Sequence, residues 1–158
     1  MAKFLLGFMG AGKSTIAALL DPEFVDMDAL LVERLGMPIS SYFDRYGEES
    51  FRQAETELLK ELLEKDGWIS TGGGIVTRAE NRALLKQAEK CVYLQADFDT
   101  LYERLVCDPD NIRPLFLQHS REALYDIFVE REPWYEEVAS HIVSVVGKKP
   151  VEIAEELG

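Results

Sequence analysis

The chain has 158 residues, 47% of them hydrophobic, and a formal net charge of −12, which fits one globular domain with a sizeable core. The excess of acidic side chains argues against a nucleic-acid partner, because a phosphate backbone is bound by clustered Lys and Arg. The sequence contains no apolar run long enough to span a membrane and no segment typical of a signal peptide, so we expect a cytoplasmic protein.

The first pattern along the chain is a glycine-rich loop between a strand-like and a helix-like run. Residues 7–15 read Gly-Phe-Met-Gly-Ala-Gly-Lys-Ser-Thr and fit the pattern G-x-x-x-x-G-K-[ST] in full. Glycine permits the tight turn that aims successive backbone N–H groups at one phosphate. The pattern predicts a nucleoside triphosphate site, with a plain glycine-rich turn as the alternative. The residues expected to bind the nucleotide are Gly10, Ala11, Gly12, Lys13, Ser14 and Thr15.

Within this loop, two side chains carry the expected chemistry. Lys13 should reach the β- and γ-phosphates, and the Ser14 hydroxyl should bind Mg²⁺. The N-terminus of the following helix adds positive potential behind both groups.

Strand-like segments alternate with helical patterns along the rest of the chain. The expected strands are residues 3–8, 23–25, 68–71, 91–95 and 141–146. The expected helices are residues 13–20, 29–35, 48–65, 78–87, 100–106 and 121–140. This alternation predicts an α/β fold, in which helices cover both faces of a parallel sheet and ligands bind beyond the carboxyl ends of its strands. Pro133 should bend or break the last helix just before Trp134.

Two carboxylates, Asp26 and Asp28, flank Met27 where the second expected strand ends. A parallel sheet places them at the same edge as the phosphate loop. One could hold Mg²⁺ through water while the other orients or deprotonates a hydroxyl acceptor. A structural alternative is that Asp28 caps helix 29–35. The neighbouring phosphate loop favours the functional interpretation, because such magnesium sites draw on a carboxylate at an adjacent strand end.

Three glycines, Gly72 to Gly74, directly follow the expected strand 68–71. Glycine at a strand's carboxyl end indicates a place where another group approaches the backbone closely. The N–H groups of this turn could bind a substrate hydroxyl, and Ser70 just before it could reach the Mg²⁺ shell.

Arg52 has acidic residues, Glu48 and Glu55, at i−4 and i+3 on its expected helix. Taken alone, this spacing favours a solvated surface arrangement worth only tenths of a kcal/mol.

Two further arginines could supply the positive charge that phosphoryl transfer needs. Residues 107–120, which include Arg113, have turn chemistry and little periodicity, so we expect a mobile lid that excludes water when it closes. Arg131 has an acidic neighbour on each side and is, on its own, as well explained as a solvated residue.

Taken together, these patterns resemble the shikimate kinases, and they cover most of the chain in the right order. Besides the loop at 7–15, the matching segments are Asp-Met-Asp at 26–28, Tyr-Gly-Glu-Glu-Ser-Phe-Arg-Gln-Ala-Glu at 46–55, Ser-Thr-Gly-Gly-Gly-Ile-Val at 70–76, Arg-Pro-Leu at 113–115 and Arg-Glu-Pro-Trp-Tyr at 131–135. The loop is generic to nucleotide-binding proteins, whereas the combination of the later motifs is specific.

The resemblance implies a three-layer α/β/α sandwich of P-loop kinase type, with a five-stranded parallel sheet, a single domain over residues 1–158 and a mobile lid at about 107–120. It implies phosphorylation of shikimate to shikimate 3-phosphate by ATP, with Mg²⁺, in aromatic amino-acid biosynthesis. A monomer is the family-level expectation.

The resemblance also assigns roles to residues. Arg52 and Arg131 would hold the shikimate carboxylate, since planar guanidinium forks suit that anion. Asp28 would bind the ring hydroxyls and assist loss of the proton from the one that attacks. The remaining roles are ring contact by Gly73 and Gly74, stabilisation of the phosphoryl group by Lys13 and Arg113, adenine stacking by Arg104, and Mg²⁺ binding by Ser14 and, through water, by Asp26 and Ser70.

The return from the phosphate loop to Asp26 is short, with only the twelve residues Ser14 to Val25 between Lys13 and Asp26. A parallel crossover needs a dozen or more residues, which leaves the placing of Asp26 and Asp28 open. Two alternatives therefore stand beside the kinase hypothesis: a kinase for another acceptor such as gluconate, and a regulator that binds MgATP without turnover.

Overall fold

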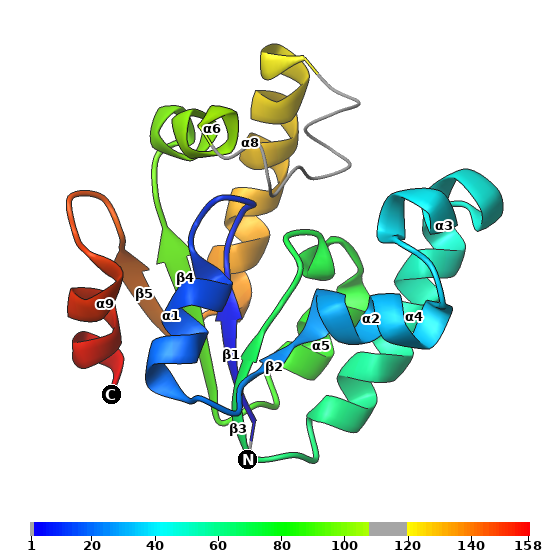
Figure 1. Cartoon of the computed structure of the whole chain (residues 1–158), viewed down its shortest axis with the longest axis horizontal. Helices are drawn as coiled ribbons and strands as arrows, with labels where there is room; N and C mark the ends of the chain where they lie inside the picture. Colours follow the sequence, from blue (N-terminus) through cyan, green and yellow to red (C-terminus); the bar gives the residue numbers. More distant parts are fainter. Residues whose placement is uncertain (1, 108–119) are drawn as a thin grey trace.

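The computed structural model describes residues 2–107 and 120–158 and contains a five-stranded sheet (Figure 1). The strands are β1 (Ala2–Leu6), β2 (Val25–Asp26), β3 (Gly67–Ser70), β4 (Lys90–Gln95) and β5 (His141–Ser144). They pair in the order β2-β3-β1-β4-β5, and every pairing is parallel. The predicted α/β fold with a five-stranded parallel sheet is confirmed.

The helices alternate with these strands. They are α1 (Lys13–Leu20), α2 (Met27–Leu35), α3 (Ile39–Tyr46), α4 (Glu48–Leu62), η1 (Ile75–Thr77), α5 (Ala79–Leu85), α6 (Phe98–Val106), α8 (Arg121–Val138) and α9 (Pro150–Leu157). Helices α1 and α9 pack together on one face of the sheet, while α4, α5 and α8 form the layer on the other (Figure 1).

The central strand β1 is buried on both faces. Phe4, Leu5 and Leu6 are each 0% exposed, as expected for a continuous apolar run in a parallel sheet covered by helices. The segment after β1 therefore begins at the middle of the sheet, between the ends of the neighbouring strands β3 and β4.

Pro133 does not break its helix, so that part of the prediction is wrong. Helix α8 runs continuously from Arg121 to Val138 with Pro133 inside it. The proline lacks the N–H that would bond to the carbonyl of Val129. Val129 lies on an exposed face of the helix, where water can take that hydrogen bond.

Two α-helices, α3 and α9, and the single-turn helix η1 are absent from the sequence-based prediction. Helix α3 has eight residues and buries none of them fully, although Ile39, Tyr42 and Phe43, at helical spacing, pack against the core. It is held by aromatic contacts, with the Phe43 ring 5.0 Å from that of Phe51 on α4. Helix α9 begins at Pro150, a residue that suits the first helical turn.

The short crossover after the phosphate loop closes through one aspartate. Asp21 ends α1, and its carboxylate accepts a hydrogen bond of 2.9 Å from the backbone N–H of Glu23. Its backbone carbonyl accepts another, of 3.0 Å, from Phe24. This tight turn delivers the chain to β2 within four residues, so the crossover is short without displacing the strand.

None of the helices in the described part of the chain is both long and apolar enough to cross a bilayer.

Helix α4 depends on its buried face, which two leucine substitutions can test. Leu59 is 0% exposed on α4, whereas Leu19 on α1 is 49% exposed. Both changes to alanine are made within a helix, so differences in helix propensity cancel. Leu59→Ala should lower the free energy of unfolding by about 2–5 kcal/mol, because it leaves a cavity. Leu19→Ala should change it by no more than about 0.5 kcal/mol. Urea unfolding of both variants measures this, and equal losses would contradict the described core.

Candidate functional site

The phosphate loop joins β1 to α1 through left-handed glycines. Gly10 and Gly12 have φ values of 88° and 90°, a conformation that disfavours side chains. The Lys13 ammonium lies along the loop and donates hydrogen bonds to the carbonyls of Gly7 at 2.7 Å and Phe8 at 3.2 Å. Helix α1 begins at Lys13, so its first N–H groups face the loop and favour an anion.

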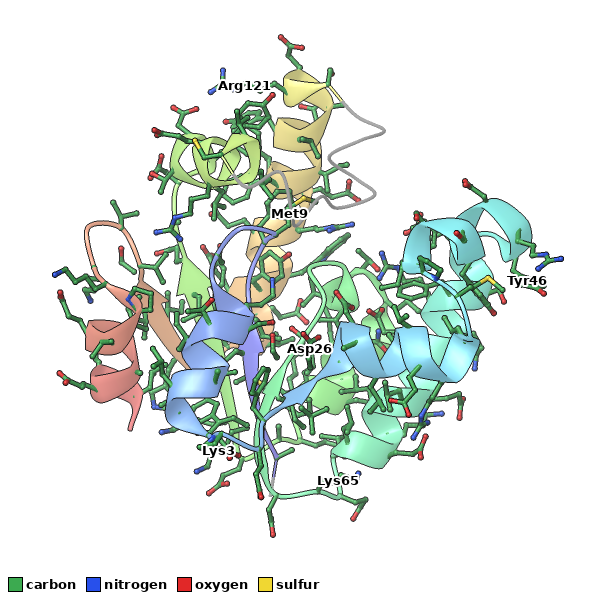
Figure 2. All side chains as sticks on the ribbon, viewed as in Figure 1. Lys3, Met9, Asp26, Tyr46, Lys65 and Arg121 are labelled. Carbon is green, nitrogen blue, oxygen red and sulfur yellow. The ribbon has the colours of Figure 1, made fainter. Side chains whose placement is uncertain are left out.

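Three oxygen-bearing side chains meet beside the loop. The Ser14 hydroxyl lies 3.3 Å from Oδ2 of Asp26 and 3.2 Å from the Ser70 hydroxyl. Strand register brings them together, since Asp26 is paired with Ser70 across β2 and β3. Asp26 is labelled in Figure 2.

This trio has the chemistry of a magnesium site that relies on a nucleotide. Hydroxyl and carboxylate oxygens are ligands that Mg²⁺ accepts, directly or through water, and its remaining positions are normally filled by water and phosphate oxygens. Among the described residues, no cluster of three or more His, Cys, Asp or Glu could hold a metal. The residues present therefore fit Mg²⁺ bound together with a polyphosphate.

The structure corrects the alternative role considered for Asp28. Helix α2 begins at Met27, and it is Asp26 whose Oδ1 accepts the capping hydrogen bond, 3.2 Å from the N–H of Ala29. The expected strand ends one residue later than predicted, so that Asp26 is both the last strand residue and the cap. Asp28 lies in the first turn of α2 and faces the pockets described next.

A large polar pocket of about 570 Å³ opens over the phosphate loop. Its lining includes most of the predicted nucleotide and metal residues, namely Gly10, Gly12, Lys13, Ser14, Thr15, Asp26, Ser70 and Arg104. Ala11 is buried within the loop. The Arg104 guanidinium on α6 donates a hydrogen bond of 3.2 Å to the carbonyl of Gly10, which holds this exposed side chain at the pocket's edge.

A smaller pocket of about 90 Å³ adjoins the first. Its polar lining comes from separate elements: Arg52 and Glu55 from α4, Arg131 from α8, and Gly72 to Gly74 from the turn after β3. Arg52 and Arg131 are only 7% and 6% exposed. Two nearly buried guanidinium groups beside one small cavity make it suited to an anionic ligand.

Lys13 and Asp28 line both pockets. A cation and a carboxylate thus stand where the contents of the large pocket meet those of the small one. This arrangement can bring a phosphoryl group and a hydroxyl acceptor together at one point.

Two of the three glycines, Gly72 and Gly74, make room for the protein's own polar side chains. A Cβ on Gly72 would lie 2.6 Å from Oδ1 of Asp28, and one on Gly74 would lie 2.7 Å from Cζ of Arg52. Real Cβ contacts essentially never fall below 3.0 Å. The predicted close approach at this turn therefore exists, and the approaching groups are Asp28 and Arg52.

Arg52 is not the solvated residue that its local spacing favours. It makes both predicted pairs, with Glu55 at 3.0 Å and with Glu48 at 3.3 Å, but Glu55 is 1% exposed. Burial raises the pKa of the Glu55 carboxyl to about 7, while Arg52 acts in the opposite direction. Glu55 was not among the predicted site residues, although it lies at i+3 from Arg52 and ends the segment 46–55 that supports the family resemblance.

The hydrophobic wall of the small pocket was also missed. Ile39 and Phe43 reach it from α3, and Met9 and Phe51 complete it. The aromatic neighbours give some signal in the sequence, but an unpredicted helix carries two of the four. Residues 108–119 of the predicted lid, which include Arg113, lie outside the described residues.

Comparison with known proteins shows similarity to the shikimate kinases. The family model described as shikimate kinase matches residues 9–158. The chain is 51% identical to shikimate kinase of Streptococcus gordonii, covering 98% of this chain and 97% of the relative, and 47% identical to that of Streptococcus thermophilus, covering 98% and 96%. Among solved structures, shikimate kinase from Acinetobacter baumannii in complex with shikimate matches with a TM-score of 0.90 and 34% identity, covering 99% of this chain and 89% of the other.

The raised pKa of Glu55 predicts a pH-dependent difference in stability. The folded state holds this proton more tightly than the unfolded state, whose carboxyl has a pKa near 4.5. The stabilising contribution is therefore complete below about pH 4.5 and is lost as the pH rises through about 7. Relative to Glu55→Gln, which cannot titrate, the wild-type free energy of unfolding should fall over that range by up to about 3 kcal/mol. Denaturant unfolding at pH 5 and pH 8 measures it, and parallel pH curves would contradict it.

Proposed function

The chain belongs to the shikimate kinase family, and we propose that it transfers the γ-phosphoryl group of ATP to a hydroxyl of shikimate. The products are ADP and shikimate 3-phosphate, an intermediate of aromatic amino-acid biosynthesis. The observation that carries the proposal is that Lys13 and Asp28 line both the polar pocket over the phosphate loop and the arginine-lined pocket beside it.

In this proposal ATP occupies the large pocket. Its phosphates lie in the phosphate loop, against the N–H groups at the start of α1. Arg104 stacks on the adenine from the pocket's edge. Ser14 would hold Mg²⁺, with Asp26 and Ser70 reaching it through water, and the bound ion would offset the negative charge of the phosphates.

Shikimate occupies the small pocket, with its carboxylate toward Arg52 and Arg131. The rigid ring lies between the turn Gly72–Gly74 and the apolar wall of Ile39 and Phe43. Burial of the two arginines strengthens their attraction for a carboxylate, because little water screens it. With the carboxylate bound by the two arginines, the hydroxyl groups of the ring face Asp28.

Asp28 orients the attacking hydroxyl and accepts its proton. The hydroxyl oxygen forms a bond to the γ-phosphorus, and the bond from that phosphorus to the ADP oxygen breaks. Lys13 stabilises the charge that spreads over the transferring group. Arg113, which lies outside the described residues, is proposed from the sequence motif alone to assist Lys13 from the lid.

The domain and its setting follow the family expectation. We propose a single domain over residues 1–158, working as a monomer in the cytoplasm, where ATP is available. The net charge of −12 supports small-molecule partners over nucleic acid.

The proposed reaction is tested by ADP release from the purified protein. We expect release with MgATP that depends on shikimate, and none above background with gluconate, whose flexible chain fits the small pocket poorly. Release with gluconate instead would identify a different acceptor. ATP binding without release in either case would support a regulator and contradict the proposal.

Arg52 should determine affinity for shikimate. Arg52→Lys keeps a positive charge beside Glu55 but loses the planar fork, so the KM for shikimate should rise about tenfold or more while the KM for ATP stays within twofold. Arg34→Lys is the matched control, because Arg34 pairs with Glu61 on the exposed surface. Steady-state kinetics of both variants decide this. An unchanged KM for shikimate in Arg52→Lys would remove Arg52 from the acceptor site.

A further inference from the structure

Tyr135 is a buried side chain next to the acceptor pocket that the proposed reaction does not use. It is 0% exposed and lies on α8 one helical turn after Arg131. Residues four apart share a helix face, so the tyrosine and the arginine point toward the same side of the site.

The tyrosine hydroxyl donates a hydrogen bond to the backbone carbonyl of Gly73. The carbonyls on either side are used within the turn itself, where Gly72 accepts from the N–H of Ile75 at 3.3 Å and Gly74 from Thr77 at 3.1 Å. Gly73 therefore has its carbonyl tied to a different element, helix α8. This bond anchors the middle of the glycine turn from outside it.

Gly73 and Arg131 lie side by side at this point. A Cβ on Gly73 would be 3.8 Å from Nη1 of Arg131, an ordinary contact distance. Burial raises the pKa of Tyr135 to about 12, with Arg131 opposing that shift. The hydroxyl thus keeps its proton at neutral pH and remains a donor to Gly73.

The ring of Tyr135 is fixed by a second tyrosine. Its centroid lies 5.0 Å from that of Tyr93 on β4, with 27° between the ring planes. The Tyr93 hydroxyl points elsewhere and lies 3.4 Å from Oε2 of Glu132. Stacking on a central strand therefore aims the Tyr135 hydroxyl at the turn.

We propose that Tyr135 is a positioning residue for shikimate: its hydroxyl fixes the Gly73 backbone beside the Arg131 guanidinium at the edge of the acceptor pocket. This inference rests on the proposed function. The tyrosine does not touch the acceptor itself but acts through two groups that do. Its loss should weaken acceptor binding and leave the nucleotide site, which lies beyond Lys13, unaffected.

Tyr135→Phe removes the hydroxyl and keeps the stacked ring. It leaves the Gly73 carbonyl without its anchor, so the KM for shikimate should rise roughly 5- to 30-fold, while kcat and the KM for ATP stay within about twofold. Tyr93→Phe is the matched control, since it removes a buried hydroxyl that faces Glu132 instead. We expect its KM for shikimate to match the wild type.

A purely structural role gives a different result. It would lower the thermal stability of Tyr135→Phe and the fraction of active enzyme, and thereby kcat, without raising the KM for shikimate. That result would overturn the proposal. So would an equal rise in KM for Tyr93→Phe.

A second variant restores a donor at the same place. Tyr135→p-aminophenylalanine retains an N–H group that can reach Gly73, and it should bring the KM for shikimate back toward the wild-type value. A folded variant of this kind with a KM for shikimate raised 5-fold or more would overturn the role of the donor, even if Tyr135→Phe does not fold. Wild-type protein is assayed first, because absence of shikimate-dependent ADP release there contradicts the proposed function and not the role of Tyr135.

Discussion

The register of three parallel strands is the constraint on which the site depends. Asp26 pairs with Ser70 across β2 and β3, and Ser70 pairs with Leu5 across β3 and β1. This alignment makes the strands end together, so that oxygen donors from distant parts of the chain meet at one edge. A slip of one residue would send the alternating side chains to the opposite face of the sheet and separate Asp26 from Ser70. The phosphate loop provides the groups that bind phosphate, and the strand register places Asp26 and Ser70 beside it.

The acceptor pocket is built from buried charge, which is costly unless it is paired. Arg52 and Glu55 pair with one another on α4, yet burial raises the pKa of Glu55 by more than Arg52 lowers it. Burying these charges lowers the stability of the fold, because they lose their hydration. It also strengthens their attraction for an anionic ligand, because the local dielectric is low. The apolar wall from α3 closes the pocket without adding further charge.

Much of the fold and the candidate site could be predicted from the sequence, and the exceptions share a cause. Periodicity and the phosphate-loop pattern are local signals, so the sheet, its order of elements and the loop were foreseeable. The burial of Arg52 was not, because the i−4 and i+3 partners look the same on a solvated helix as on one packed against a pocket. Helix α3 was missed although Ile39, Tyr42 and Phe43 recur at helical spacing, because the helix has only eight residues and buries none of them fully. Helix α8 likewise continues through Pro133 because Val129 is exposed to water, and local sequence does not indicate that exposure.

The crowding at the glycine turn limits where the acceptor pocket can change. The volume that a side chain would need at Gly72 or Gly74 is already filled by Asp28 and Arg52, so a bulkier residue there removes a working group before it reshapes the cavity. The opposite wall has no such conflict, because Ile39 and Phe43 are half-buried and carry no charge. Substitutions on α3 can therefore adapt the pocket to a different cyclic acid, in nature or in the laboratory. The glycine turn cannot change in this way without displacing Asp28 or Arg52.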